Sequence, residues 1–157
     1  IAGTSANDII YASSLNLSQS DIIDGGTGDD VLTLTLENDI KTIGKISNVE
    51  ILEIISLGDF SLDLSGIESI QKIVSKDSLG DILITGLENA NAKFEFFGDN
   101  VNSISLASND LGGPNDLLDI TLRSANNVKF VGPYGYETGK INIIGDSSFE
   151  NITSIPF

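Results

Sequence analysis

The chain has 157 residues, 40% of them hydrophobic, which is enough for one domain with a buried core and too apolar for an acidic disordered tail. Its formal net charge is −15, from 23 acidic and 8 basic residues; this argues against nucleic acid and anionic membrane partners and favours cations. Cysteine and histidine are absent, which excludes disulfides, thiolate or ordinary zinc sites, and Ser-His or Cys-His catalysis. No apolar run approaches the ~18 residues of a membrane span, so we expect no membrane insertion. The chain begins with Ile1, and we expect it to be part of a longer protein.

Two glycine-aspartate segments come first along the chain. Residues 21–34 read DIIDGGTGDDVLTL, and residues 25–33 fit the nonapeptide G-G-x-G-x-D-x-U-x of calcium-binding β-helix repeats, where U is a large apolar residue. Residues 3–11 follow the same frame in degenerate form. Asp8 and Asp30 therefore occupy equivalent positions, one coil apart, with an insertion at SSLNLSQS.

These two segments predict a calcium site. Glycines allow positive φ and let carbonyl oxygens converge, and carboxylates are the hard ligands that calcium prefers. The predicted ligands are, in order of preference, the carboxylates of Asp8, Asp24 and Asp30, the backbone oxygens of Gly26 and Gly28, and then Asp29 and Asp21. The alternative is a tight turn capped by aspartate, without a cation.

The next segment, residues 37–46, places Ile40, Ile43 and Ile46 on one stripe, which predicts a short helix or an irregular loop. From residue 31 onward the remainder alternates between apolar and polar residues, as half-buried strands do. The expected strands are residues 31–36, 49–55, 60–66, 70–75, 81–86, 92–98, 103–108, 117–122, 128–132, 140–145 and 152–157.

The strands recur about every 11 residues, with two or three residues added near the Gly-Gly-Pro at 112–114. Residues 47–50, 65–68 and 85–88 share a second pattern: a small hydroxyl residue, a turn former, an apolar residue and Glu. Two strands per repeat of ~20 residues match the length of one solenoid coil. We therefore expect an all-β fold, a parallel β-solenoid or β-roll, with an antiparallel β-sandwich as the alternative.

Other acidic positions are open to two interpretations. Asp110 and Asp116 flank the Gly-Gly-Pro turn, which is either a second calcium loop or a plain surface turn. Glu50 opens the strand nearest the first module. It is either a further ligand or a side chain that satisfies backbone N–H groups at a coil corner.

Residues 3–11, 21–36, 46–54 and 60–67 resemble a module of calcium-binding bacterial surface-layer proteins related to the repeats-in-toxin (RTX) family. The shared features are a degenerate GTxxND, the block D-x-I-D-G-G-x-G-x-D-x-L-x-L, the segment I-S-N-V-E-x-L-x-I, and L-D-L-S-G-I. The resemblance implies a calcium-stabilised β-solenoid, exported by type I secretion to the bacterial cell surface, that polymerises into a lattice. Its calcium ligands carry over to Gly26, Gly28 and Asp30, followed by Asp8 and Asp24. One clean nonapeptide implies one or a few structural ions.

On this interpretation residues 1–36 form calcium-binding coils, and residues 37–157 continue the same domain as a structural module. The alternative is a calcium-stabilised binding module of a large secreted adhesin, in which the aromatic loop at 132–136 stacks on cell-surface polysaccharide. We do not expect an enzyme, because Arg123 is the only arginine and the chain has little room for a catalytic cleft.

Overall fold

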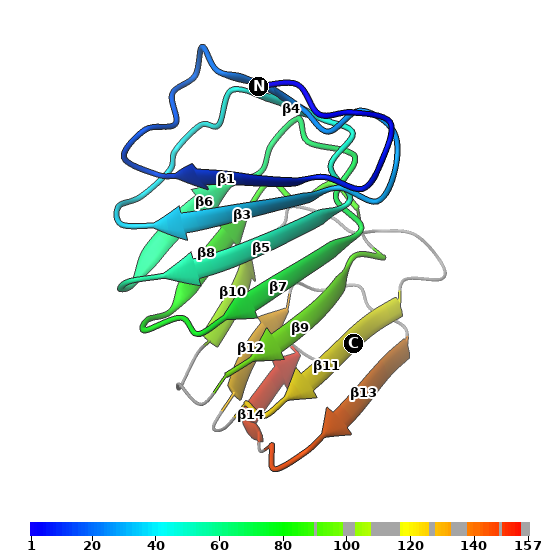
Figure 1. Cartoon of the computed structure of the whole chain (residues 1–157). Coiled ribbons are helices and arrows are strands. Elements are labelled where there is room, and N and C mark those ends of the chain that lie inside the picture. The colour runs from blue at the N-terminus through cyan, green and yellow to red at the C-terminus, as the bar shows by residue number, and fades with distance from the viewer. Residues whose placement is uncertain are drawn as a thin grey trace.

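In the computed structural model of the chain, short parallel strands wind into a β-solenoid (Figure 1). The structure describes residues 1–89, 91–98, 103–107, 117–125, 128–132, 138–147 and 149–154. Within these ranges every strand pair is parallel. The predicted solenoid is therefore confirmed, and the antiparallel sandwich is excluded.

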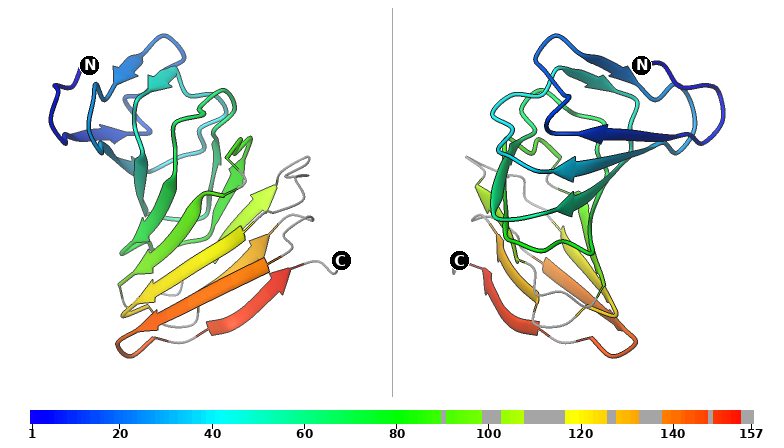
Figure 2. Two further views of the ribbon diagram at one scale, coloured as in Figure 1. Left: turned by 90° about the vertical axis from the view of Figure 1, so that its right-hand side faces the viewer. Right: turned by 60° about the vertical axis from the view of Figure 1, so that its left-hand side comes forward.

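From β5 onward, successive strands alternate between two sheets that face each other across the core (Figures 1 and 2). The seven-stranded sheet holds β1 (Ile9–Ser13), β3 (Val31–Leu36), β5 (Ile51–Ser56), β7 (Lys72–Lys76), β9 (Lys93–Phe97), β11 (Leu117–Arg123) and β13 (Thr138–Ile144). The five-stranded sheet holds β6 (Phe60–Asp63), β8 (Ile82–Thr85), β10 (Ser103–Ala107), β12 (Val128–Gly132) and β14 (Phe149–Ser154). A third sheet pairs β2 (Ile22–Asp24) with β4 (Lys45–Ser47) near the N-terminal end.

Coil length is nearly constant along the solenoid. Partners in neighbouring strands of the seven-stranded sheet lie 22, 20, 21, 21, 26 and 21 residues apart. The longest step, from β9 to β11, contains the insertion expected near residues 112–114, and it exceeds the two or three residues predicted. The seven-stranded sheet continues without interruption past residue 36, the predicted boundary between the calcium-binding coils (residues 1–36) and the rest of the domain.

The core consists of apolar side chains stacked in rows along the solenoid axis. One row is Leu32, Leu52, Ile73, Phe94 and Ile120, which pair in register and are at most 1% exposed. Burying a side chain of this size contributes about 1.5–3 kcal/mol, so each coil adds stability when it covers the one before.

The segment that the sequence assigned to a helix or a loop is irregular and contains no helix. Ile40 forms an isolated parallel bridge with Leu62, and β4 includes Ile46. Ile40, Ile43 and Ile46 are buried, as their stripe suggested, but the backbone bonds run to neighbouring coils. The structure describes no helix long and apolar enough to cross a membrane.

Candidate calcium-binding corner

The corner before the seven-stranded sheet stacks acidic residues from the first three coils. Because Ile9 pairs with Val31 and Val31 with Ile51, the residues just before them, Asp8, Asp30 and Glu50, occupy equivalent places in successive coils. The predicted equivalence of Asp8 and Asp30 is thereby confirmed.

In this stack a carboxylate accepts a backbone N–H of the preceding coil. Asp30 Oδ1 lies 2.7 Å from the backbone nitrogen of Asp8, and Glu50 Oε2 lies 2.9 Å from that of Asp30. In the first coil Asp8 turns back on its own loop, where its Oδ2 accepts hydrogen bonds from the backbone nitrogen and Oγ1 of Thr4, at 2.6 and 2.8 Å. Of the two interpretations of Glu50, the geometry supports satisfaction of a backbone N–H at a coil corner.

Asp30 differs from its neighbours because it is completely buried and only half satisfied. Its exposed fraction is 0%, and within the described part of the chain its Oδ2 has no hydrogen-bond partner. This oxygen faces Gly25, where an added Cβ would lie 2.7 Å from it and 1.8 Å from the backbone oxygen of Asn48. A buried, ionised carboxylate oxygen without a partner costs several kcal/mol, and a cation would remove that cost.

The other acidic residues predicted as ligands within residues 21–29 form hydrogen bonds within their own turns or to neighbouring coils. Asp24 Oδ1 accepts hydrogen bonds from Asn48 Nδ2 at 2.8 Å and from the backbone nitrogen of Gly26 at 3.1 Å. The Asn48 bond, followed by the Gly26 bond, holds the pKa of Asp24 below its usual value. Asp21 Oδ2 closes a turn by accepting the backbone N–H of Ser18 at 2.7 Å. Asp29 is exposed, and its backbone nitrogen donates to the side chain of Asn7.

The glycines of the motif have a packing role that the sequence did not reveal. Gly26 and Gly28 have φ values of 99° and 135°, where other residues are strained. In addition, a Cβ at Gly26 would lie 2.0 Å from the backbone oxygen of Thr4. The first coil therefore passes directly against the second, and this contact requires glycine whether or not a cation is present.

This corner offers the right kinds of donor atom for calcium, but too few of the described acidic side chains come together to complete a coordination shell. Its donors are carboxylate and carbonyl oxygens, the ligand types of calcium, which takes 6–8 of them. Yet the described residues contain no group of three or more acidic side chains arranged to hold a metal ion. Asp110, Asp116 and most of the aromatic loop, residues 133–136, lie outside the described residues.

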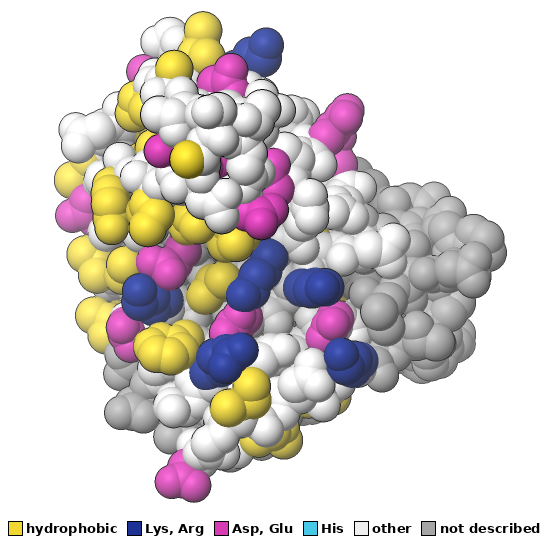
Figure 3. Space-filling model, turned by 45° about the vertical axis from the view of Figure 1, so that its right-hand side comes forward, with side chains coloured by type: hydrophobic (Ala, Val, Ile, Leu, Met, Phe, Trp, Pro, Cys, Tyr) yellow, Lys and Arg dark blue, Asp and Glu magenta, His cyan; other side chains and the backbone are white. Residues whose placement is uncertain are grey.

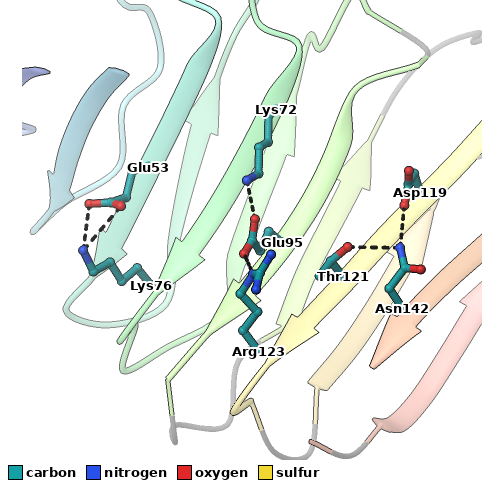
Figure 4. Close-up of polar contacts among 8 residues, drawn as sticks. All are labelled: Glu53, Lys72, Lys76, Glu95, Asp119, Thr121, Arg123 and Asn142. Carbon is teal, nitrogen blue, oxygen red and sulfur yellow. Dashed lines mark hydrogen bonds and ion pairs between the residues drawn. The ribbon is translucent and has the colours of Figure 1, made fainter. Parts of the chain in front are cut away.

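Sequence reasoning missed a set of polar contacts on the outer face of the seven-stranded sheet (Figure 4). Glu95 on β9 is only 8% exposed. It forms ion pairs with Lys72 on β7 and Arg123 on β11, and both side chains donate hydrogen bonds to it. Lys76 lies 3.4 Å from Glu53 in a second ion pair. These charged residues occupy the outward-facing, alternate positions of their strands, and they recur about one coil length apart in the sequence. That recurrence is the signal from which the contacts could have been predicted.

A third group on this face joins β11 to β13. Asn142 Nδ2 donates hydrogen bonds to Asp119 Oδ1 and Thr121 Oγ1, both at 3.3 Å. These side-chain contacts link neighbouring coils, as the backbone hydrogen bonds of the sheet do. They therefore hold the side chains of a solvent-facing surface in place.

Comparison with protein-family models, with curated proteins and with solved structures finds no match to this chain, so the functional conclusion depends on the geometry described above.

Proposed function

We propose that this protein is a structural module of a bacterial cell-surface layer, which folds with calcium and associates with further copies of itself. The observation that carries the calcium part is Asp30, a buried carboxylate with an unpaired oxygen where the first coils stack. The regular solenoid supports a structural role, since coils of nearly constant length place side chains at a fixed spacing along a rigid body.

Calcium would supply positive charge against Asp30 Oδ2. Asp8, Asp24, Gly26 and Gly28 are the candidates for the remaining ligands, and Asp29 is a further one. The effect on the protein is to fasten the first coil to the second, because Asp8 and Asp30 belong to different coils that already share a hydrogen bond. Outside cells calcium is ~millimolar, so even a weak site would fill.

The proposal is tested by titrating calcium into chelator-treated protein, with binding followed by calorimetry and particle size by light scattering. Asp30→Asn removes the buried charge and keeps an oxygen for the N–H of Asp8. The matched control is Asp146→Asn, an exposed position at the far end of the solenoid. Calcium at about 100 times its dissociation constant should stabilise the wild type and the control by about 2.7 kcal/mol and leave Asp30→Asn unchanged.

In chelator, Asp30→Asn should be at least as stable as the wild type, since the uncompensated buried charge is gone. Failure of the wild type to bind calcium, or equal stabilisation of Asp30→Asn, would mean that the corner is only a capped turn. Calcium binding without particle growth would favour the adhesin module over the self-assembling layer.

A further inference from the structure

The outer face of the seven-stranded sheet differs in charge from the rest of the molecule. Its outward positions carry Lys72, Lys76, Lys93, Arg123 and Lys140 together with Glu53, Glu95 and Asp119. These five basic and three acidic residues give the face a formal charge of +2, and the other 3 basic and 20 acidic residues leave −17 elsewhere. Figure 3 shows Lys and Arg side chains gathered on this face among acidic and apolar ones.

The same face exposes apolar surface. Phe97 is 42% exposed, and towards the N-terminal end Tyr11 is 74% and Ile9 61% exposed. A hollow of about 360 Å³ lies between Phe97 and the ion pairs and is also lined by Val31 and Ile51. Exposed apolar side chains bordered by charged residues are typical of docking surfaces.

Two lysines of this face are poorly neutralised. Lys93 is exposed and forms no ion pair within the described part of the chain. Lys140 reaches Asp119 only at 4.0 Å and its side chain is 60% exposed. Lys93 also pairs in register with Lys72, so these two positions lie on adjacent rungs of the sheet.

An acidic counterpart lies at the five-stranded sheet. Asp39, Asp59 and Asp81 are exposed around a hollow of about 370 Å³, which Phe60 and Leu83 also line. Asp59 Oδ1 accepts the backbone N–H of Asp81 at 2.8 Å, so these two residues also belong to adjacent rungs. We call the group of Asp39, Asp59 and Asp81 the acidic hollow.

We propose that the outer face of the seven-stranded sheet binds the acidic hollow of a second copy of this chain. The signs of charge are opposite, both surfaces include apolar residues, and paired rungs on both are about 4.8 Å apart. Lys93, which has no ion pair within the described part of the chain, can therefore face Asp59 and Asp81, and Lys140 lies two rungs further along the same face. The inference rests on the self-association in the proposed function and names the surfaces that carry it.

The contact joins two different surfaces, so each copy keeps one of each unused. Such a heterologous interface does not close on itself unless its rotation forms a ring, and otherwise it extends into an open array. An open array of this kind supplies one direction of a surface layer, and a second contact would join such arrays side by side.

The test uses two double variants and one single control. Lys93→Glu with Lys140→Glu changes the formal charge of the face from +2 to −2. Asp59→Asn with Asp81→Asn removes charge from the acidic hollow and keeps an oxygen that can accept the N–H of residue 81. Lys129→Glu is the control, a charge reversal at an exposed lysine outside both the face and the acidic hollow.

Self-association is measured by sedimentation velocity at fixed calcium and low salt, after circular dichroism has shown that each variant is folded. The wild type and the lysine control should form large particles, and the face and hollow variants should each associate at least tenfold more weakly. A mixture of the face and hollow variants should form a one-to-one dimer and nothing larger, because it restores one intact interface.

Two results would overturn the inference. If the wild type assembles and the face variant assembles equally well, the lattice uses other surfaces, although the proposed function stands. If the wild type stays monomeric and binds a soluble acidic polysaccharide through this face, the occupant is that polymer, and the self-association in the proposed function is wrong as well.

Discussion

At the scale of single residues, many acidic side chains of this protein accept hydrogen bonds from backbone N–H groups that have no partner in a sheet. At coil corners, and along the outer edge of β6, backbone N–H groups have no partner in a neighbouring strand. Asp39 Oδ1 accepts the N–H of Ser61, and Glu88 Oε1 accepts that of Gly66, each at 2.8 Å across 22 residues. The Ser61 bonds, backbone first, hold the pKa of Asp39 below its usual value, so this carboxylate stays charged.

Glu95 gives a prediction about pH at this scale. Burial alone would raise the pKa of Glu95, but the hydrogen bond and charge of Lys72, followed by those of Arg123, outweigh it and lower the pKa. A carboxyl group with a lowered pKa contributes stability above its unfolded value, here 4.5, and loses it as the pH falls through the folded value. Glu95→Gln should therefore reduce the free energy of unfolding by about 1–2 kcal/mol at pH 7, and by much less once the pH has fallen below the lowered pKa of Glu95.

Urea unfolding at several pH values measures this difference. Glu53→Gln is the matched control, since the one ion pair that Glu53 forms among the described residues, with Lys76 at 3.4 Å, is worth about 0.5 kcal/mol or less. A loss at Glu95 that did not change with pH would show that the contribution is packing and not charge.

At the scale of strands and turns, the three turns at residues 47–50, 65–68 and 85–88 each place one residue in a left-handed conformation. Asn48, Gly66 and Gly86 have φ values of 52°, 80° and 64°, and each precedes an apolar residue that is buried: Val49, Ile67 or Leu87. The shared pattern of hydroxyl, turn former, apolar residue and Glu thus has a physical basis. The turn former reverses the chain and the apolar residue returns it to the core.

Gly25 and Gly66 are required for different reasons: Gly25 by close packing against the next coil, and Gly66 by its left-handed backbone conformation. A Cβ at Gly25 would lie 1.8 Å from a backbone oxygen of the next coil, whereas at Gly66 it would have no atom within 4 Å but would keep a φ of 80°. Gly25→Ala should reduce the free energy of unfolding by about 3 kcal/mol or more, and Gly66→Ala by about 1 kcal/mol. Denaturant unfolding of both variants checks the order, and equal losses would mean that the coils separate easily at Gly25.

At the scale of the whole molecule, each coil is stabilised mainly by packing against its two neighbours. Most contacts join neighbouring coils, so each coil depends on the ones beside it. β1 lies at the edge of the seven-stranded sheet, and its one described strand partner is β3. The interior strands β7 and β9 are covered on both sides.

Removal of calcium should therefore loosen the molecule from its N-terminal end. With a chelator, amide exchange of β1 and β2 should speed up at least tenfold, while exchange of β7 and β9 should stay within about twofold. Hydrogen exchange followed by mass spectrometry of peptides measures both regions at once. Uniform acceleration, or no change in β1, would contradict a calcium clamp between the first two coils.

Much of the fold was predictable, because local patterns encode it. Strands β3 and β12 were predicted to the residue, and the bounds of the other nine predicted strands lie within three residues of those observed, because alternation of apolar and polar side chains is a property of each segment alone. β1, β2 and β4 were not anticipated as strands. β2 and β4 are three residues long and exist only because they pair with each other.

The calcium site was predictable only in part. The sequence correctly aligned Asp8 with Asp30, since their frames repeat. It could not distinguish an oxygen that accepts a backbone N–H from one left without a partner, because donor and acceptor come from coils about 20 residues apart. The face with Lys72, Glu95 and Arg123 was missed for the same reason, since it joins three strands.

The sequence by itself determined an all-β chain, a coil of about 20 residues, the buried positions and the acidic character, all of which follow from periodicity and composition. Only the tertiary structure decided that the strands are parallel, that Asp30 is buried with one oxygen unpaired, and that the basic residues gather on one sheet face. The physical reason is that these properties depend on the register between coils. Register is a relation between distant segments, and no single segment carries it.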